Sequence, residues 1–307
     1  MLICTKGGNE MICVTGAGGT VGSEVIKQLE ASKTPFRAAY FSENKASAAR
    51  SRGIDAVIID YNKPQTLETA FRGCDKLFLL GPNEQNQTQL EVNAVEAGKA
   101  AGVRHIVKLS VLGADQEDFL LSKIHRPVEK AIQSSDIAWT ILRPNGYMQN
   151  VVTYMGDTIR SQGAFFTASG DGKISHVDVR DLAAVAVKAL KEPGHEGKVY
   201  SLTGPEALTY DDIAKELSKA LGRTVNHINL SPSDLKNGML ATGTPEWFTD
   251  MLLDLERYYR EQRASIITGD IKKVIGRDPI EFEQYARDYA SALTPVEKDA
   301  RVMERGN

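Results

Sequence analysis

Residues 12–22 read ICVTGAGGTVG, and residues 23–29 continue as SEVIKQL. The apolar start predicts a buried strand, the glycines predict a tight turn, and the apolar spacing beyond them predicts a helix. Such a glycine spacing lets the backbone approach a pyrophosphate closely and lets the helix pack hard against a sheet. The first amides of the helix then point at the phosphates, supported by the helix dipole. The turn therefore predicts a dinucleotide site in preference to a merely structural role. The cofactor contacts expected here are Gly16, Gly18, Gly19, Thr20, Val21 and Gly22.

Strand and helix patterns alternate through the first half of the chain. We expect strands at 36–41, 55–59, 76–80, 105–109 and 138–142, and helices at 46–52, 64–71, 85–101 and 118–133. Pro127 should bend the last of these helices or mark a fresh first turn within it. Because helical crossovers join the strands, we predict an α/β fold with a doubly wound parallel sheet.

The second half returns to this sheet and then becomes mainly helical. We expect a helix at 151–161, an extended segment at 164–167, a short strand at 174–177, a helix at 178–191 and a last sheet strand at 199–202. Beyond Gly204 and Pro205, helices are expected at 210–221, 233–241, 246–263 and 280–292. The predicted domains are a nucleotide-binding domain at 11–150, to which 174–204 return, and a smaller helical domain at 151–173 and 205–300.

Composition and charge argue against several classes of function. The chain has 307 residues and a formal net charge of -3, so nothing favours nucleic acid as a partner. Its cysteines, Cys4, Cys13 and Cys74, are odd in number and irregularly spaced, which favours a reduced, cytoplasmic compartment. No apolar stretch approaches the roughly 18 residues of a membrane span. Residues 1–10 lack the apolar core of a signal peptide, and Met11 offers an alternative start.

Ligands of an open parallel sheet bind outside the carboxyl ends of its strands. The second strand, whose end normally contacts the adenosine ribose, ends in FSENK at 41–45. Ser42 and Lys45 suit a 2′-phosphate, but Glu43 would repel one, and Lys45 is equally well interpreted as a solvated charge at a helix start. The balance favours NADPH, with NADH as the alternative. Further cofactor contacts expected at the strand ends are Phe41, Ser42, Lys45, Asp60, Tyr61, Leu80, Gly81 and Pro82.

Several separated motifs resemble one protein family. The turn TGAGGTVG at 15–22 resembles the GxxGxxG turn of the extended and atypical short-chain dehydrogenases/reductases. The segments AGVRHIV at 101–107, WTILRP at 139–144, VDVRDLA at 177–183 and LTYDDIA at 208–214 are similar to its NmrA-like branch. The resemblance implies a Rossmann fold, NAD(P) binding and a pocket between two domains. Members include NAD(P)H-dependent quinone, azo-dye and triphenylmethane reductases, and also cofactor-sensing regulators with no known turnover.

The chain departs from most short-chain dehydrogenases at their proton-donating pair. Those enzymes use a tyrosine and a lysine four residues later, but the matching helix here reads LSKIHRPVE at 121–129. Aligned on Glu129, Leu121 stands at the tyrosine position and His125 at the lysine position, so the usual proton relay is absent. The bacterial quinone and dye reductases look similar at this point, because they also carry a histidine. Direct hydride transfer to an electron-poor acceptor needs no strong acid there.

Two residues are candidates for catalysis at the nicotinamide. His125 is expected to hydrogen-bond the nicotinamide ribose or to supply a proton near neutral pH, against the alternative of one more histidine on a helix face. Ser110 ends the fifth strand, where this fold places a hydroxyl near the nicotinamide, and a strand-end cap is the equal alternative. Asn145 is a further expected cofactor contact. The expected substrate residues are Tyr147, Met148, Asn150, Trp247 and Phe248, whereas the aromatic spacing of Tyr258 and Tyr259 favours the core.

The combined prediction is an NAD(P)H-dependent reductase that passes hydride directly to a planar, electron-poor acceptor such as a quinone or conjugated dye. Two alternatives remain open: a non-catalytic NAD(P)-binding redox sensor with a protein partner, and a biosynthetic reductase of an imine or enone. The histidines show no metal-ligand spacing, so no metal is expected. We expect a cytoplasmic monomer or homodimer with a small aromatic or quinone-like substrate, no nucleic acid and no membrane.

Overall fold

The main sheet has seven parallel strands in the order β3-β2-β1-β4-β5-β6-β8, within a computed structural model that describes residues 10–295. The order reverses at β1, where Ile12 is level with Phe36 of β2 on one side and with Lys76 of β4 on the other. Such a reversal opens a crevice at the carboxyl ends of the strands, where ligands bind. The strands are β1 (Ile12–Val14), β2 (Phe36–Tyr40), β3 (Ala56–Ile58), β4 (Lys76–Leu79), β5 (His105–Leu109), β6 (Ala138–Pro144) and β8 (Lys198–Leu202).

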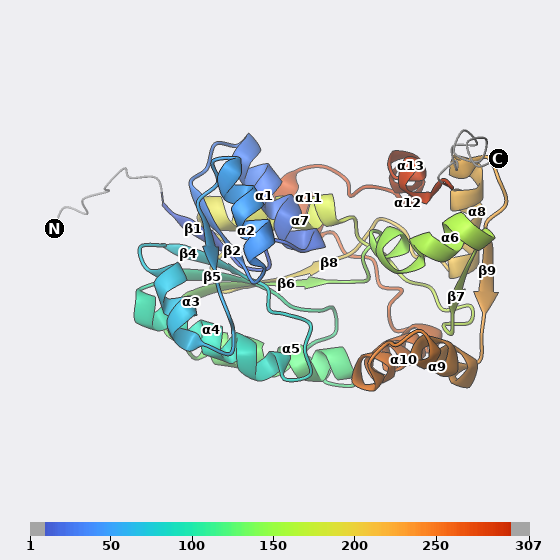
Figure 1. Cartoon of the computed structure of the whole chain (residues 1–307), viewed down its shortest axis with the longest axis horizontal. Coiled ribbons are helices and arrows are strands. Elements are labelled where there is room, and N and C mark those ends of the chain that lie inside the picture. Colours follow the sequence, from blue (N-terminus) through green and yellow to red (C-terminus); the bar gives the residue numbers. More distant parts are fainter. Residues whose placement is uncertain (1–9, 296–307) are drawn as a thin grey trace, which may run out of the picture.

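Helices cover both faces of this sheet (Figure 1). One face carries α1 (Thr20–Ala31), α2 (Glu43–Ser51), α7 (Val179–Lys191) and α11 (Asp270–Ile275), and the other carries α3 (Pro64–Phe71), α4 (Gln87–Ala101) and α5 (Leu120–Gln133). Strand side chains alternate between two apolar cores, so Ile12 and Val14 join the first and Cys13 joins the second. The predicted doubly wound α/β fold is confirmed.

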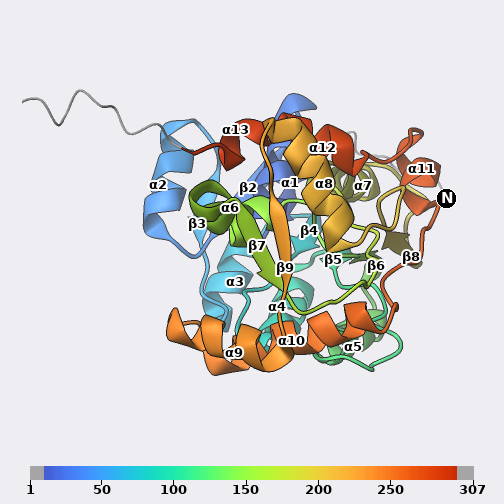
Figure 2. The same ribbon diagram turned by 90° about the vertical axis from the view of Figure 1, so that its right-hand side faces the viewer.

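A second, mainly helical part lies beyond the carboxyl ends of the strands, and Figure 2 shows it facing the viewer. Its strands β7 (Ala164–Thr167) and β9 (Asn226–Asn229) form a two-stranded parallel sheet. A third apolar core, which includes the fully buried Phe165, Phe282 and Tyr285, holds this part together. Its helices are η1 (Val151–Met155), α6 (Gly156–Gln162), α8 (Tyr210–Leu221), α9 (Pro232–Ala241), α10 (Glu246–Arg260), α12 (Phe282–Asp288) and α13 (Ala290–Leu293).

The structure differs from the sequence prediction mainly in this second half. Residues 174–177 form isolated bridges instead of a strand, because their partners, Tyr147 and Leu208, stand in loops. The helix predicted at 246–263 ends at Arg260, and the one predicted at 280–292 is divided at Tyr289. The helix predicted at 151–161 begins with the π-helical η1. In the first half, α5 stays one helix across Pro127.

Two elements escape sequence reasoning. β9 reads NHIN, which is too polar to stand out as a strand, and α11 is a helix of six residues with two lysines. Ile271 and Val274 of α11 join the apolar core beside α7, so part of 205–300 packs with the nucleotide-binding sheet. Cys4 and residues 296–300 lie outside the described residues. Within residues 10–295, no helix combines the length and apolar content that a membrane crossing requires.

Candidate functional site

The glycine turn places bare backbone at the amino end of α1. Gly16 has a φ of +64°, which other residues adopt only with strain. A Cβ at Gly22 would lie 2.1 Å from the Gly16 carbonyl oxygen, so only glycine lets α1 pack against the turn. Gly19 caps α1 without a side-chain hydrogen bond, and the first helical turn carries no acidic residue. The N–H groups of Thr20 and Val21 donate to no acceptor among the described residues, so they are available to bind an anion.

A cavity of about 430 Å³ extends from this turn along the ends of β2, β3 and β4. Most of the predicted cofactor residues line it. Five do not: Thr20 and Val21 offer amides from α1, Gly22 acts through close packing, and His125 and Asn145 line a second cavity. The lining residues are Gly16, Ala17, Gly18, Gly19, Ala39, Tyr40, Phe41, Ser42, Lys45, Ile59, Asp60, Tyr61, Asn62, Leu80, Gly81, Pro82 and Glu84.

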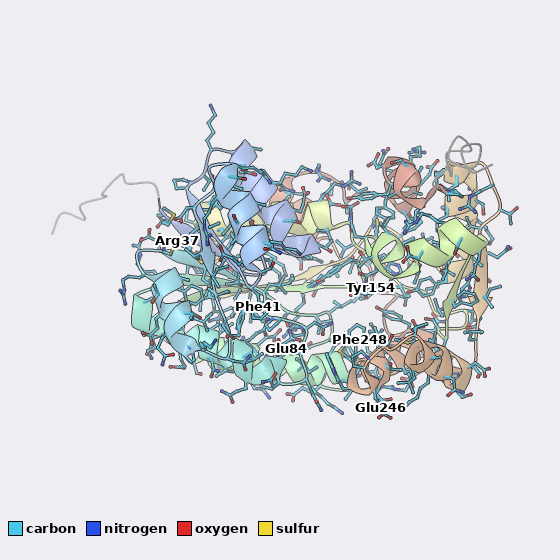
Figure 3. All side chains as sticks on the ribbon, in the orientation of Figure 1. Arg37, Phe41, Glu84, Tyr154, Glu246 and Phe248 are labelled. Carbon is cyan, nitrogen blue, oxygen red and sulfur yellow. The ribbon has the colours of Figure 1, made fainter. Side chains whose placement is uncertain are left out.

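The side chains that follow β2 surround the outer end of this cavity. Lys45 Nζ donates to the Gly18 carbonyl at 2.9 Å, which brings its charge next to the glycine turn. Glu43 pairs with Arg50 at 2.8 Å, so the carboxylate that is expected to repel a phosphate is partly neutralised. Phe41 is 77% exposed at the rim (Figure 3). Lys45 is the one cation among the described residues that line the cavity.

Leu80 and Gly81 line both this cavity and a second one of about 240 Å³. Their backbone is held on two sides: the Leu80 N–H donates to Thr15 Oγ1 at 2.9 Å, and the Tyr61 hydroxyl donates to the Leu80 carbonyl at 2.9 Å. A Cβ at Gly81 would lie 2.4 Å from Cγ of Glu91, so no side chain fits there. The two cavities therefore meet at a fixed point of backbone beyond β4.

Ser110 lies in the second cavity at the end of β5. Its hydroxyl donates to Glu129 Oε1 at 2.6 Å, and Arg143 binds the same carboxylate through bonds of 2.9 and 2.7 Å. Burial raises the pKa of Glu129, but hydrogen bonds from Arg143, Ser110 and Arg126 outweigh it and hold that pKa below its ordinary value. Since the Ser110 hydrogen is used on Glu129, only its oxygen lone pairs remain for a ligand.

His125 and Asn145 face the same cavity from α5 and from the end of β6. Burial first, and then the charge of Lys108, lower the pKa of His125 well below its ordinary value, so the imidazole is neutral near pH 7. A neutral imidazole carries no second proton to give up, so this direction favours the expected hydrogen-bonding role of His125 over that of a proton donor. The Asn145 Nδ2 group donates to Ser175 Oγ at 2.9 Å and to the Ala264 carbonyl at 2.8 Å, so both of its hydrogens are already used.

Aromatic and apolar side chains line the rest of the second cavity. Tyr147 and Phe248 are among them, and the polar side chain of Asn150 lines the cavity too; all three are predicted substrate residues. Tyr154 of η1 and Phe248 of α10 come from opposite sides of the opening (Figure 3). Flat apolar walls of this kind suit a planar ring. The cavity is also lined by apolar residues from the start of α5 and from α10, namely Phe119, Leu121, Met251, Leu252, Leu255, Tyr258 and Tyr259.

Two predicted substrate residues do not line this cavity. Met148 is 1% exposed in the apolar core of the second part, because its N–H bonds to the Val177 carbonyl and its side chain turns inward. Trp247 packs edge-on against Phe248 with ring centroids 5.6 Å apart, outside the lining. Sequence reasoning also misses that Tyr258 and Tyr259 line the cavity as well as joining the core. The helical spacing along α10 marks one apolar face but cannot tell core from cavity.

Comparisons with known proteins agree with this geometry. Residues 16–193 match a protein family described as NAD(P)H-binding. NAD(P)H azoreductase of Xenophilus azovorans is 35% identical over 284 residues, 92% of this chain and 99% of that protein. The solved structure of the NADPH-dependent quinone oxidoreductase QOR2 from Escherichia coli, complexed with NADPH, is 33% identical, with a TM-score of 0.81 over 91% of this chain and 99% of that one. For the Citrobacter triphenylmethane reductase complexed with NADP(H), the identity is 30% and the TM-score 0.80 over 91% and 99%.

Proposed function

This chain belongs to the NAD(P)H-binding family, and from that premise we propose that it is a reductase of planar, electron-poor acceptors such as quinones and conjugated dyes. The observation that carries the proposal is the junction of the two cavities at Leu80 and Gly81. A dinucleotide that lies along the first cavity ends at this junction, beside the aromatic walls of the second. When bound, the nicotinamide supplies hydride directly to the acceptor.

The residues of the first cavity fit a dinucleotide. The amides at the start of α1 have neither a side-chain cap nor an acidic neighbour, so they suit the pyrophosphate. The steric demand for glycine at position 22 keeps the helix close enough for those amides to reach it. Phe41 at the rim provides a flat surface for the adenine end. The chain thus contributes binding and orientation, and the cofactor supplies the hydride.

The second cavity supports an acceptor that needs no strong acid. The tyrosine and lysine of the usual proton relay are replaced by Leu121 and His125, and the imidazole is neutral near pH 7. Tyr154 and Phe248 provide flat surfaces at the opening. The names of the relatives, an azoreductase, a quinone oxidoreductase and a triphenylmethane reductase, support the same class of acceptor.

NADPH is the preferred cofactor in this proposal. Lys45 brings a positive charge to the end of the cavity where a 2′-phosphate would lie, and Arg50 offsets the charge of Glu43. No acidic side chain at the end of β2 is free to bind a ribose hydroxyl as in NAD-specific sites. NADH remains the alternative, with weaker binding.

The organisation of the molecule is proposed as follows. Residues 11–150 and 174–204 bind the cofactor, and residues 151–173 together with 205–295 cover the acceptor, apart from α11, which packs with the sheet. Both cavities are lined by one chain, so a monomer or a homodimer suffices. Cys13 and Cys74 are buried free thiols, which supports a reducing, cytoplasmic compartment.

The test is to titrate the protein with NADPH and then add a panel of acceptors while following the absorbance of the reduced nicotinamide. We expect rapid oxidation by quinones, azo dyes or triphenylmethane dyes. Binding of NADPH without oxidation by any acceptor would contradict the proposal and favour a redox-sensing regulator. Oxidation only by imines or enones would favour a biosynthetic reductase. Gly19→Val serves as the control in which cofactor binding, and therefore oxidation, is lost.

A further inference from the structure

A cluster of three charged or titratable side chains lies behind the second cavity. Lys108 of β5 and Glu91 of α4 are each 0% exposed, and His125 of α5 connects them to the cavity. Burying a lysine and a glutamate away from water is costly unless both are paired and hydrogen-bonded. This free-energy cost is incurred at the edge of the candidate active site, which suggests that the buried pair has a functional role.

The Lys108 ammonium is fully engaged. Its Nζ donates to Glu91 Oε1 at 2.8 Å, to the carbonyl of Leu109, and toward His125 Nδ1 at 3.3 Å. An ammonium has three hydrogens and no acceptor site, so three acceptors match its charged form. Burial lowers the pKa of Lys108 and outweighs the charge of Glu91 and its hydrogen bond, which raise it, so the net shift is downward.

This arrangement decides which nitrogen of His125 carries the hydrogen. Since Nδ1 faces an ammonium, which can only donate, Nδ1 must be the acceptor. The other carboxylate oxygen, Glu91 Oε2, is 3.9 Å from Nδ1, too far to take a hydrogen from it. The neutral imidazole therefore carries its hydrogen on Nε2. No described residue hydrogen-bonds Nε2, and His125 lines the second cavity.

Glu91 joins the histidine to the cofactor path. Its Oε1 also accepts the Gly81 N–H at 2.8 Å, at the point where the two cavities meet. The same carboxylate thus fixes both the backbone between the cavities and the lysine that holds His125. Neither Glu91 nor Lys108 needs to touch a ligand to influence the site.

We propose that Lys108 and Glu91 are positioning residues that hold His125 as a neutral Nε2–H donor aimed at the acceptor. The inference rests on the proposed function and concerns acceptors that carry a lone pair. A quinone oxygen or an azo nitrogen would lie opposite this hydrogen, where charge gathers as hydride arrives. A permanently neutral donor provides that hydrogen bond without a change of its own protonation.

The pH behaviour follows from every charged group around the imidazole. Lys108 of β5 and Glu91 of α4 pair with each other, and Glu129 of α5 itself pairs with Arg143 of β6. On α10, Asp254 pairs with Arg257. Lys108 Nζ lies 3.3 Å from His125 Nδ1 and opposes protonation of the imidazole, whereas the Glu91 carboxylate, with Oε2 3.9 Å from Nδ1, favours it. Burial and the lysine together outweigh the carboxylate and lower the pKa of His125. His125 stays neutral at every pH above its lowered pKa, so activity shows no inflexion near the ordinary histidine value.

The test reads the imidazole directly by nitrogen NMR of the full-length protein without cofactor, from about pH 6 to about pH 8. We expect one neutral species with the hydrogen on Nε2 throughout. In the double variant Lys108→Met with Glu91→Gln, no lone charge is left buried, and the imidazole should lose its preference for the hydrogen on Nε2, because no ammonium faces Nδ1 any longer. The pKa of His125 should rise only part of the way to its ordinary value, because burial, the larger cause of the shift, remains. Lys123→Met, an exposed lysine of the same helix, is the matched control and should change neither readout.

A hydrogen on Nδ1, or a charged imidazolium at pH 7, would overturn the inference. If the double variant fails to fold, the wild-type spectrum still decides. A second pair of variants separates the effect of the hydrogen-bond donor from that of side-chain volume. His125→Gln can keep an N–H near the Nε2 position, and His125→Leu cannot. We expect His125→Leu to lose about tenfold more kcat than His125→Gln, the effect of one hydrogen bond, and equal losses would count against the donor role. A wild-type protein with the expected tautomer but no acceptor reduction would refute the proposed function alone.

Discussion

The two cavities are constructed by different means. The cofactor cavity starts from backbone, with free amides at α1 and glycines at positions 16 and 22 that tolerate no larger residue. The acceptor cavity is made of side chains from several elements, and two buried ion pairs, Lys108–Glu91 and Arg143–Glu129, support it from behind. Cofactor binding therefore depends on the absence of side chains, whereas acceptor chemistry depends on their placement and on buried charge.

The largest effect is expected where buried charge supports the acceptor cavity. Glu129→Gln leaves Arg143, 9% exposed, without its bidentate partner, so the free energy of unfolding at pH 7 should fall by about 3 kcal/mol. Urea unfolding measures this change. Glu117→Gln, which removes the exposed pair with Lys130, is the control and should cost under about 0.5 kcal/mol. Equal costs would show that the buried pair contributes no more than a surface pair.

The same ion pair predicts a dependence of stability on pH. The folded-state pKa of Glu129 lies below its ordinary value of 4.5, so its contribution is complete above about pH 4.5 and is lost as the pH falls through the folded value. Wild-type protein should therefore lose more stability than Glu129→Gln on acidification below about pH 4.5. Parallel losses in the two proteins would remove Glu129 from the explanation.

The next effect tests the backbone cavity. A Cβ at position 19 would lie 3.4 Å from the Gly16 carbonyl oxygen, so Gly19→Val leaves the turn folded while its side chain covers the amides. The NADPH dissociation constant should rise about 100-fold, equivalent to about 2.7 kcal/mol, with the melting temperature kept. Fluorescence titration gives the constant. Gly238→Val, where a Cβ meets nothing within 4 Å, is the matched control; equal affinities in the two variants would contradict the phosphate role of the turn.

The same contrast explains what the sequence could predict. The bounds of β5 and α3 match the predicted ranges because continuous apolar and helical patterns are local signals. The glycine turn is local too, so most of the cofactor cavity could be read from neighbouring residues. Lys108 could not, because a lysine within HIVKL gives no sign that Glu91, 17 residues earlier, meets it in the interior. The inward orientation of the Met148 side chain could not be predicted either, because its backbone N–H bonds to a residue distant in sequence, Val177.

A smaller effect is expected at the aromatic wall. Phe248→Ala removes a lining ring, so KM for a planar dye should rise about tenfold while the NADPH dissociation constant stays unchanged. Trp247→Ala removes the ring behind it, which packs on Phe248 without lining the cavity, and should raise KM by only about twofold. Steady-state kinetics with both substrates varied checks the pair. A larger effect at Trp247 would show that the lining is assigned to the wrong ring.

The smallest effect concerns the choice of cofactor. Lys45→Met removes the one cation among the described residues that line the cofactor cavity, and the preference for NADPH over NADH should fall about fivefold, near 1 kcal/mol. Comparison of kcat/KM for the two cofactors measures it. Lys27→Met, an exposed lysine of α1 paired with Glu24, should leave the preference unchanged. An unaltered preference in Lys45→Met would leave this lysine as a solvated charge only.

Direct passage of hydride across the junction of the cavities can be followed by isotope transfer. The measurement uses NADPH with deuterium at both C4 positions and a triphenylmethane dye as acceptor. The colourless product is analysed by mass spectrometry, because the new hydrogen on its central carbon does not exchange with water. We expect one deuterium in the product from the labelled cofactor, and none when unlabelled NADPH reacts in heavy water. Deuterium taken from the solvent instead, or no reduction while NADPH is bound, would contradict a site in which nicotinamide and acceptor meet beside Leu80 and Gly81.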